Sequence, residues 1–206
     1  MTEMNPNARL QIFSDGVFAI AITLLILEIQ VPPLEMMRSE GDVWQAIGHL
    51  WPSFLALLLS FIIIFISWYG HHALMDVTER TSSQFQFANG FFLFTVVIIP
   101  FPTAFMAEHL NSPFAQPAIV FYCVATLLHN IGWRILLHSV VRPKVSTEYS
   151  PLVNLVKKTI KGHQYGILIN MGIAILSWWF PYIALAFSIL FWSYWLYHAL
   201  SSKQAL

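Results

Sequence analysis

Charged side chains and cysteine are both scarce in this 206-residue chain. Only 10% of its residues are charged, whereas about a quarter are charged in an ordinary soluble domain. Hydrophobic residues make up 57% of the chain, and the mean hydropathy is +0.65. This composition is typical of an integral membrane protein. The formal net charge is zero, so the bulk charge does not indicate a nucleic-acid partner.

Several sequence patterns are also missing, and each absence argues against a class of protein. The single cysteine, Cys123, has no intrachain partner for a disulfide. The alternating period-two pattern of a membrane β-barrel is absent, and no internal repeat of the transporter kind is visible. Neither an H-E-x-x-H nor a G-x-S-x-G motif is present. We therefore expect that the chain is not an enzyme.

Six apolar segments approach the length of about 20 residues that a membrane-spanning helix needs. They cover about residues 10–30, 44–70, 85–106, 114–138, 166–180 and 181–200. Pro100 and Pro102 should kink or unwind the end of the third segment. The last two segments together exceed one span, which favours a division at Pro181. The sequence thus predicts an all-α integral membrane protein of six transmembrane helices, forming one domain over residues 1–206.

Basic residues predict the orientation of these spans. With a cytoplasmic N-terminus, nine of the ten Lys and Arg residues fall on the cytoplasmic side and only Arg38 lies outside. The positive-inside rule then places both termini in the cytoplasm. Residues 140–162 form the main cytoplasmic loop, in which residues 152–160 are expected to make a short surface helix next to membrane lipid. The nine cytoplasmic residues are Arg9, Arg80, Arg134, Arg142, Lys144, Lys157, Lys158, Lys161 and Lys203.

The segment from Arg9 to Ile29 carries both charges and a continuous apolar stripe. At about 100° per residue, six residues lie within about 60° of Ile20 on a helix. Asp15 lies about 140° from Ile20 and must find hydrogen-bond donors inside the protein. The Ile20 stripe is left to face either lipid or a symmetry axis, and the spacing does not decide between them. The six residues are Phe13, Gly16, Val17, Thr23, Leu24 and Leu27.

Histidines also occur within or at the ends of these apolar segments. His71 and His72 are adjacent and point about 100° apart, so they do not form one metal-binding face. We expect one of them to bond the Ser14–Asp15 region and the other to meet water. His129 and His138 fall on opposite faces of one helix, which favours an interhelical hydrogen bond over a haem or metal site. No metal and no cofactor is expected.

The first span begins with a motif that resembles a known family. Arg9, Phe13, Ser14 and Asp15 fit the pattern R-x-x-x-F-S-D, and the similarity continues through residues 16–29. In this the chain resembles the transmembrane protein 175 family, the potassium channels of endolysosomes and their prokaryotic relatives. Its length and six predicted spans are similar to those of the single-repeat prokaryotic members. That family lacks the usual potassium-filter loop, and this chain likewise has no T-V-G-Y-G sequence.

The resemblance implies a homotetramer in which the first helices line a central pore. It maps the family's hydrophobic filter onto Ile20, Leu24 and Leu27 and its hydroxyl layer onto Thr23. These residues belong to the stripe described above. The implied function is a potassium-permeable cation channel that uses this constriction instead of a carbonyl filter. Potassium and other monovalent cations would be the permeants, and the membrane would be the plasma membrane of a prokaryotic cell.

Two points stay open at this stage. A secondary transporter, or an intramembrane enzyme that uses the buried histidines, is the alternative function. Glu28, at about 80° from Ile20, either raises the cation concentration at the outer mouth or bonds a neighbouring loop.

Overall fold

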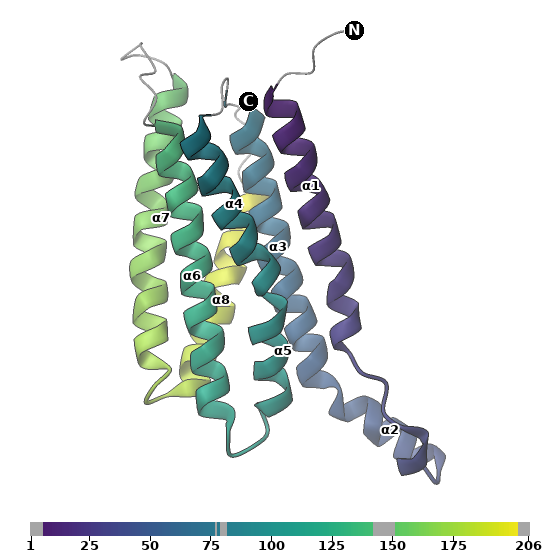
Figure 1. Ribbon diagram of the computed structural model, residues 1–206. Helices are drawn as coiled ribbons and strands as arrows, with labels where there is room; N and C mark the ends of the chain where they lie inside the picture. The colour runs from purple at the N-terminus through teal and green to yellow at the C-terminus, as the bar shows by residue number, and fades with distance from the viewer. Residues whose placement is uncertain (1–5, 77, 79–81, 142–150, 202–206) are drawn as a thin grey trace, which may run out of the picture.

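The chain folds into a bundle of long α-helices, with one short helix set off to the side (Figure 1). This computed structural model describes residues 6–76, 78, 82–141 and 151–201. The described residues form α-helices and two short 3-10 helices, with no strand among them. The α-helices are α1 (Pro6–Leu24), α2 (Glu40–His49), α3 (Trp51–Asp76), α4 (Ser83–Ile98), α5 (Pro100–His109), α6 (Ala115–Val141), α7 (Pro151–Leu176) and α8 (Pro181–Ser201).

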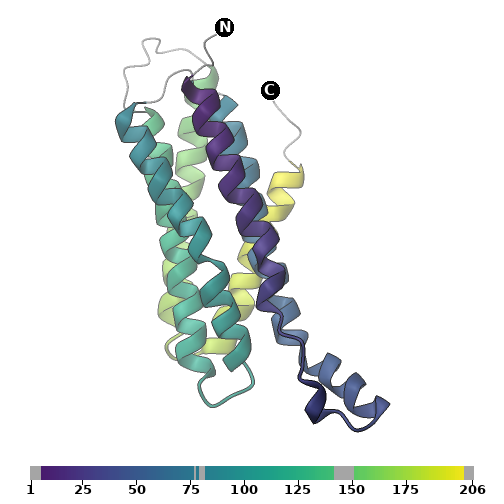
Figure 2. The ribbon, with the colours of Figure 1, turned by 45° about the vertical axis from the view of Figure 1, so that its right-hand side comes forward.

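Successive long segments of the bundle run in alternating directions. As a result α1 begins and α8 ends toward the same end of the bundle, as both views show (Figures 1 and 2). Among the described residues, five helical segments are long and apolar enough to cross a membrane by length and composition. They are 7–28, 40–76, 83–109, 115–140 and 181–201. The predicted all-helical membrane architecture is confirmed at this level.

The core consists of large apolar side chains that several helices contribute. Phe18 of α1, Ile63 of α3, Phe92 of α4 and Leu136 of α6 are each at most 1% exposed. Close approach of the helices matters here, because lipid is as apolar as these side chains and gives no hydrophobic drive to pack them. Gly132 allows such an approach between α6 and α4. A Cβ atom placed there would lie only 3.0 Å from Thr95 Oγ1.

Prolines explain where two of the predicted spans are interrupted. The third span breaks between α4 and α5 at Pro100, so the predicted kink is confirmed. The expected span 44–70 is instead two helices, because α2 ends at His49 and α3 begins at Trp51. Pro52 is the second residue of α3, where its missing N–H costs nothing. In an uninterrupted helix its ring would clash with the carbonyl of Gly48.

Other helix bounds also differ from the expected ones. The first span is α-helical only to Leu24 and then tightens into the 3-10 helix η1 (Leu25–Glu28). A second 3-10 helix, η2 (Leu34–Met36), lies in the linker to α2. Helix α7 runs unbroken from Pro151, so residues 152–160 do not form a separate surface helix. The division at Pro181 is confirmed, because α8 begins there after a turn.

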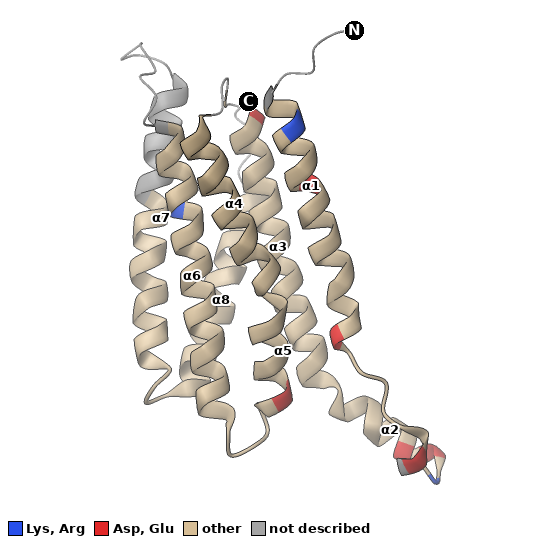
Figure 3. Cartoon of the chain, in the orientation of Figure 1, with Lys and Arg blue, Asp and Glu red and all other residues tan. Residues whose placement is uncertain are grey.

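Charges are distributed unevenly between the two ends of the bundle (Figure 3). Arg9 lies at the end where α1 begins, and Arg38 lies at the opposite end beside α2. Most acidic residues of the described part lie toward the α2 end, whereas Asp76 ends α3 at the other end; the residues toward the α2 end are Glu28, Glu35, Glu40, Asp42 and Glu108. Four of the predicted cytoplasmic basic residues, Arg80, Arg142, Lys144 and Lys203, lie outside the described residues, as do the side chains of Lys157, Lys158 and Lys161.

Candidate functional site

Helix α1 has one face buried in the bundle and one face that the described chain leaves open. Ser14, Phe18 and Leu25 on the inner face are 0%, 1% and 2% exposed. They follow one another at intervals of four and seven residues, which keeps them on the side that packs against α3 and α4. On the outer face, Ile20 is 60% exposed and Leu24 is 52% exposed. The predicted stripe is therefore the open face of the first helix.

The stripe continues past the end of α1, where the helix changes its pitch. Leu27 belongs to η1 and is 72% exposed. In a 3-10 helix, side chains three residues apart lie one above the other. Leu27 is therefore brought into line with Leu24, which immediately precedes η1. An ideal α-helix would have turned the two side chains about 60° apart.

Thr23 lies on the same open face, between Ile20 and Leu24 in the sequence. Its Oγ1 donates to the backbone oxygens of Ala19, at 2.9 Å, and Ile20, at 3.0 Å. A hydroxyl has one proton and two lone pairs. Because the proton is turned back to the helix, the Thr23 oxygen presents lone pairs to the outside. An oxygen in this state can accept a hydrogen bond from water or contact a cation.

Toward the end of the bundle where α1 begins, a group of polar side chains connects α1 to α3 and α4. Asp15 Oδ1 accepts a hydrogen bond of 2.9 Å from Trp68 Nε1 of α3. Ser14 Oγ accepts one of 3.0 Å from Asn89 Nδ2 of α4 and donates to the backbone of its own helix. Asn89 Oδ1 in turn accepts from His71 Nε2 at 2.7 Å. The group thus joins three helices through donors and acceptors that match.

The two adjacent histidines have different surroundings. His71 is fully buried and reaches Ser14 only through Asn89. His72 is exposed; its Nδ1 lies 3.2 Å from Gln11 Nε2, and its Nε2 lies 3.7 Å from Asp76 Oδ2. Neither ring hydrogen-bonds Asp15 directly in the part of the chain that the structure describes; the Trp68 indole takes that position.

The other two motif residues do not take part in this group. Arg9 is exposed, and the described residues contain no ion pair between it and Asp15. Phe13 is 61% exposed and lies on the open side of α1 with Ile20. The sequence reasoning missed Asn89. Its signal was a lone amide between apolar residues in F-A-N-G-F-F.

The buried histidine of the second pair makes the interhelical contacts that were predicted. His129 Nε2 lies 2.8 Å from Ser67 Oγ of α3, and its Nδ1 lies 3.1 Å from Thr95 Oγ1 of α4. His138 is exposed and takes no part. Nearby, Trp133 Nε1 donates to His163 Nε2 at 2.6 Å, which connects α6 to α7. Within the described residues no three His, Cys, Asp or Glu side chains gather as a metal site would need.

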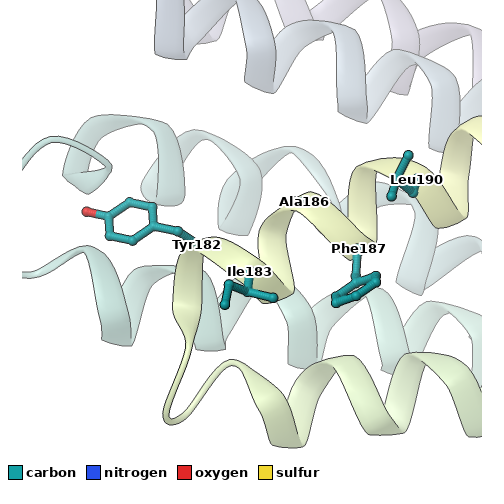
Figure 4. A pocket seen from close by; sticks show the side chains of 5 residues that line it. All are labelled: Tyr182, Ile183, Ala186, Phe187 and Leu190. Carbon is teal, nitrogen blue, oxygen red and sulfur yellow. The ribbon is translucent and has the colours of Figure 1, made fainter.

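A shallow groove of about 340 Å³ runs along the outer side of α8 (Figure 4). Its lining offers no acid, base or nucleophile apart from one phenol, and that phenol donates to the backbone oxygen of Leu110. The groove is therefore a gap in the apolar surface rather than a place for chemistry. The lining residues are Tyr182, Ile183, Ala186, Phe187 and Leu190.

These helices define the chain as a helical multi-pass membrane protein. Residues 9–100 match the model of the family described as the endosomal/lysosomal potassium channel TMEM175. The chain belongs to this TMEM175 family, because a Chryseobacterium potassium channel is 33% identical over 190 residues, which is 92% of each chain.

Two further comparisons agree with this assignment. A potassium channel of Chamaesiphon minutus is 45% identical over 120 residues, an alignment that spans 58% of this chain and 59% of the relative. The fold is similar to the crystal structure of a lysosomal potassium-selective channel TMEM175 homolog from Chamaesiphon minutus, with a TM-score of 0.83 and 32% identity. That match covers 94% of this chain and 97% of the other.

Proposed function

We propose that the chain is a potassium-permeable cation channel. In this proposal residues 1–206 form a single six-span domain, with α7 as its fifth span and α8 as its sixth, and four copies assemble with α1 at a central axis. The observation that carries it is the open face of α1. Ile20, Leu24 and Leu27 stay exposed while the opposite face of the helix is locked into the bundle. The names of the family and of the bacterial relatives support potassium as the permeant.

The stripe supplies a mechanism for passing and blocking ions. Four copies of Ile20 around an axis would form a narrow apolar ring, which blocks ions by losing its water and passes them when it widens. Thr23 oxygens beside this ring would replace part of the water that a cation sheds. The cost of dehydration then favours the larger potassium ion over sodium, with modest selectivity because no carbonyl filter takes part.

Charge placement supports an orientation and a role for the pore mouth. Both chain termini would face the cytoplasm of a prokaryotic cell, with Arg9 inside and Arg38 outside. Glu28 would then stand at the outer mouth, just beyond Leu27. It is exposed, and the described residues offer it no hydrogen bond that would favour the rim alternative. An open carboxylate at that place raises the local concentration of cations.

Two alternatives have less support. An intramembrane enzyme would need convergent catalytic groups, yet His71 and His129 are each engaged by hydroxyl or amide partners of the bundle. A secondary transporter would need a coupling ion. The break at Pro100 is the one feature that favours it, since transporters bind substrate at interrupted helices.

Liposomes with opposed potassium and sodium gradients test the proposal. A channel gives resolvable single-channel current steps that reverse near the potassium equilibrium potential. Flux that requires a counter-ion would instead establish a transporter, and a current carried by protons alone would exclude potassium permeation.

Ile20→Asn tests the constriction itself. A polar side chain should keep the ring wet, and lowering the barrier by about 1.4 kcal/mol would raise conductance about tenfold. Selectivity for potassium over sodium should fall at the same time. Ile175→Asn on α7 is the matched control, because Ile175 is 56% exposed and outside the stripe. An unchanged current–voltage relation in Ile20→Asn would remove Ile20 from the constriction.

A further inference from the structure

Helix α2 leaves the bundle at the end where α3 begins (Figures 1 and 2). A capping box fixes its start: Asp42 N donates to Ser39 Oγ at 3.3 Å, and Ser39 N donates back to Asp42 Oδ2 at 2.9 Å. Its other end is fixed by Pro52, with Leu50 as the only residue between the two helices. Strong signals at both ends make α2 a helix in its own right rather than a frayed extension of α3.

The two sides of α2 differ sharply in polarity. At about 100° per residue, Val43, Ile47 and Trp44 share an arc of about 100°, into which only Glu40 of the first turn also falls. Asp42, Gln45 and His49 occupy an arc of about 60° on the other side. No residue of α2 is buried, and the three apolar side chains are 40%, 47% and 72% exposed. From Val43 onward the helix therefore carries an apolar face that none of the described residues buries.

Connectivity determines what lies beside this face. α2 continues within one residue into the span α3, whose first turns expose Trp51, Phe54 and Leu58 by 48%, 50% and 56%. α2 must therefore lie where that span leaves the hydrocarbon, at the level of the lipid headgroups. Tryptophan is enriched at this level, where its ring meets both apolar chains and water. Helices that lie in the plane of the interface have this amphipathic pattern.

Charge argues against a second copy of the chain as the occupant of this face. Among the described residues the α2 end carries Arg38 and five acidic side chains, namely Glu28, Glu35, Glu40, Asp42 and Glu108. A neighbouring copy would bring mostly like charges to the helix. A zwitterionic lipid headgroup brings an ammonium group to the same carboxylates. An anionic headgroup would be repelled by them.

We propose that α2 is an interfacial helix that inserts Val43, Trp44 and Ile47 into a leaflet of zwitterionic lipid. This inference rests on the placement of the chain in a membrane and not on its proposed conduction of potassium. The helix would hold the linker 29–39, which joins it to η1, at the membrane surface. It would thereby set the depth at which Leu27 and Glu28 sit relative to the headgroups.

Fluorescent labels on the two faces of α2 test this proposal. Full-length Cys123→Ala protein carrying either Ile47→Cys or Gln45→Cys is labelled with an environment-sensitive dye and reconstituted into phosphatidylcholine vesicles. Lipid spin-labelled near the headgroup should quench the label at position 47 about threefold more than the one at 45, given insertion of about 5–10 Å. Aqueous iodide should show the opposite order. Val43→Cys provides a second probe of the apolar face.

Each other outcome would overturn the inference. If iodide reaches both labels equally, α2 lies in water. If neither quencher reaches position 47 or 43, a second copy covers the apolar face. Replacing part of the phosphatidylcholine by phosphatidylglycerol should weaken lipid quenching at position 47, and stronger quenching would refute the argument from charge. Labelled variants enter the comparison only if their elution on size exclusion matches that of the unlabelled protein.

Discussion

At the scale of single residues, Thr23 differs from its neighbours in the stripe because it alone has an oxygen atom in its side chain. Its proton is held by the backbone of α1, so the hydroxyl can serve a cation only as an acceptor. Thr23→Val keeps the shape and removes that oxygen. We expect conductance to fall about two- to tenfold, which corresponds to the loss of about 0.5–1.5 kcal/mol of ion–oxygen interaction. Single-channel recording measures this change.

Thr23→Ser is the matched control, because it retains the hydroxyl and should keep at least most of the conductance. If Val and Ser variants conduct equally, the Thr23 oxygen does not contact the ion.

Asp15 is the residue where hydrogen bonding and charge can be separated. Its carboxylate accepts from Trp68, and Asp15→Ala would leave that indole N–H without a partner. The cost should be about 1–2 kcal/mol of bundle stability, seen as a lower thermal midpoint and a smaller tetramer fraction in detergent. Asp15→Asn retains an acceptor oxygen and should recover most of both. Ion selectivity should change less than assembly in either variant, and a normal tetramer yield for Asp15→Ala would contradict an anchoring role.

The sequence could predict the polar anchor of α1 but not its partners. The angle between Asp15 and Ile20 follows from helical geometry alone, and it correctly separates the inner from the outer face. Helical periodicity tells which face of α1 carries Ser14. It does not tell which other helix packs against that face. Asn89 therefore stayed hidden even though a lone amide in an apolar span is conspicuous. For the same reason the donor to Asp15 was left open between histidines and tryptophans of other spans, and Trp68 is the residue that meets it.

At the scale of helices, α4 and α6 approach each other closely at Gly132. Thr95 is held in place by hydrogen bonds to Phe92 O, at 2.6 Å, and to His129. It cannot easily move away from a new methyl group at Gly132. We expect Gly132→Ala to cost about 1–3 kcal/mol through overpacking and to lower the thermal midpoint measured in detergent.

Gly172→Ala on α7 is the control for this change, because a Cβ there meets nothing within 4 Å. It should raise the midpoint, since alanine favours a helix over glycine by about 0.8–1 kcal/mol. Equal midpoints for the two variants would show that α4 and α6 can separate freely.

Helix positions were predicted better than helix ends. Apolar length alone locates the spans, and the prolines at 100 and 181 mark real breaks. The separation of α2 from α3 was missed because Trp44 and Ile47 lengthen the apolar run of α3, although Gly48 and His49 interrupt that run and Pro52 follows. The change from α-helix to 3-10 helix at Leu25 is not marked by a proline or glycine in the sequence. Such a change reflects tertiary packing, here the burial of Leu25 against the bundle.

At the scale of the whole molecule, the stripe of α1 does not by itself reveal how many copies assemble. Ile175 and Leu190 are 56% and 63% exposed on other helices, about as much as Ile20. Exposure in one chain therefore looks the same for a side chain that meets lipid and one that meets a symmetry axis. Helix α4 also combines exposed apolar side chains, such as Phe94, with a buried polar residue, Asn89, so this combination does not distinguish α1 either. A pore shared among copies has a consequence that a pore within each copy lacks.

Mixed assemblies of wild-type and Ile20→Asn subunits exploit this difference. If every copy contributes Ile20 to one ring, co-reconstitution should yield single-channel conductances between those of the two pure proteins. Each added Asn would lower the dewetting barrier by part of the full effect. Tagging one subunit type and purifying through the tag keeps mixed assemblies in the sample, and Ile175→Asn subunits mixed in the same way should leave conductance unchanged. If only the two parental conductances occur, each subunit conducts by itself and the central pore is wrong. Three intermediate levels would point to four copies, because one to three substituted subunits are then possible in a ring.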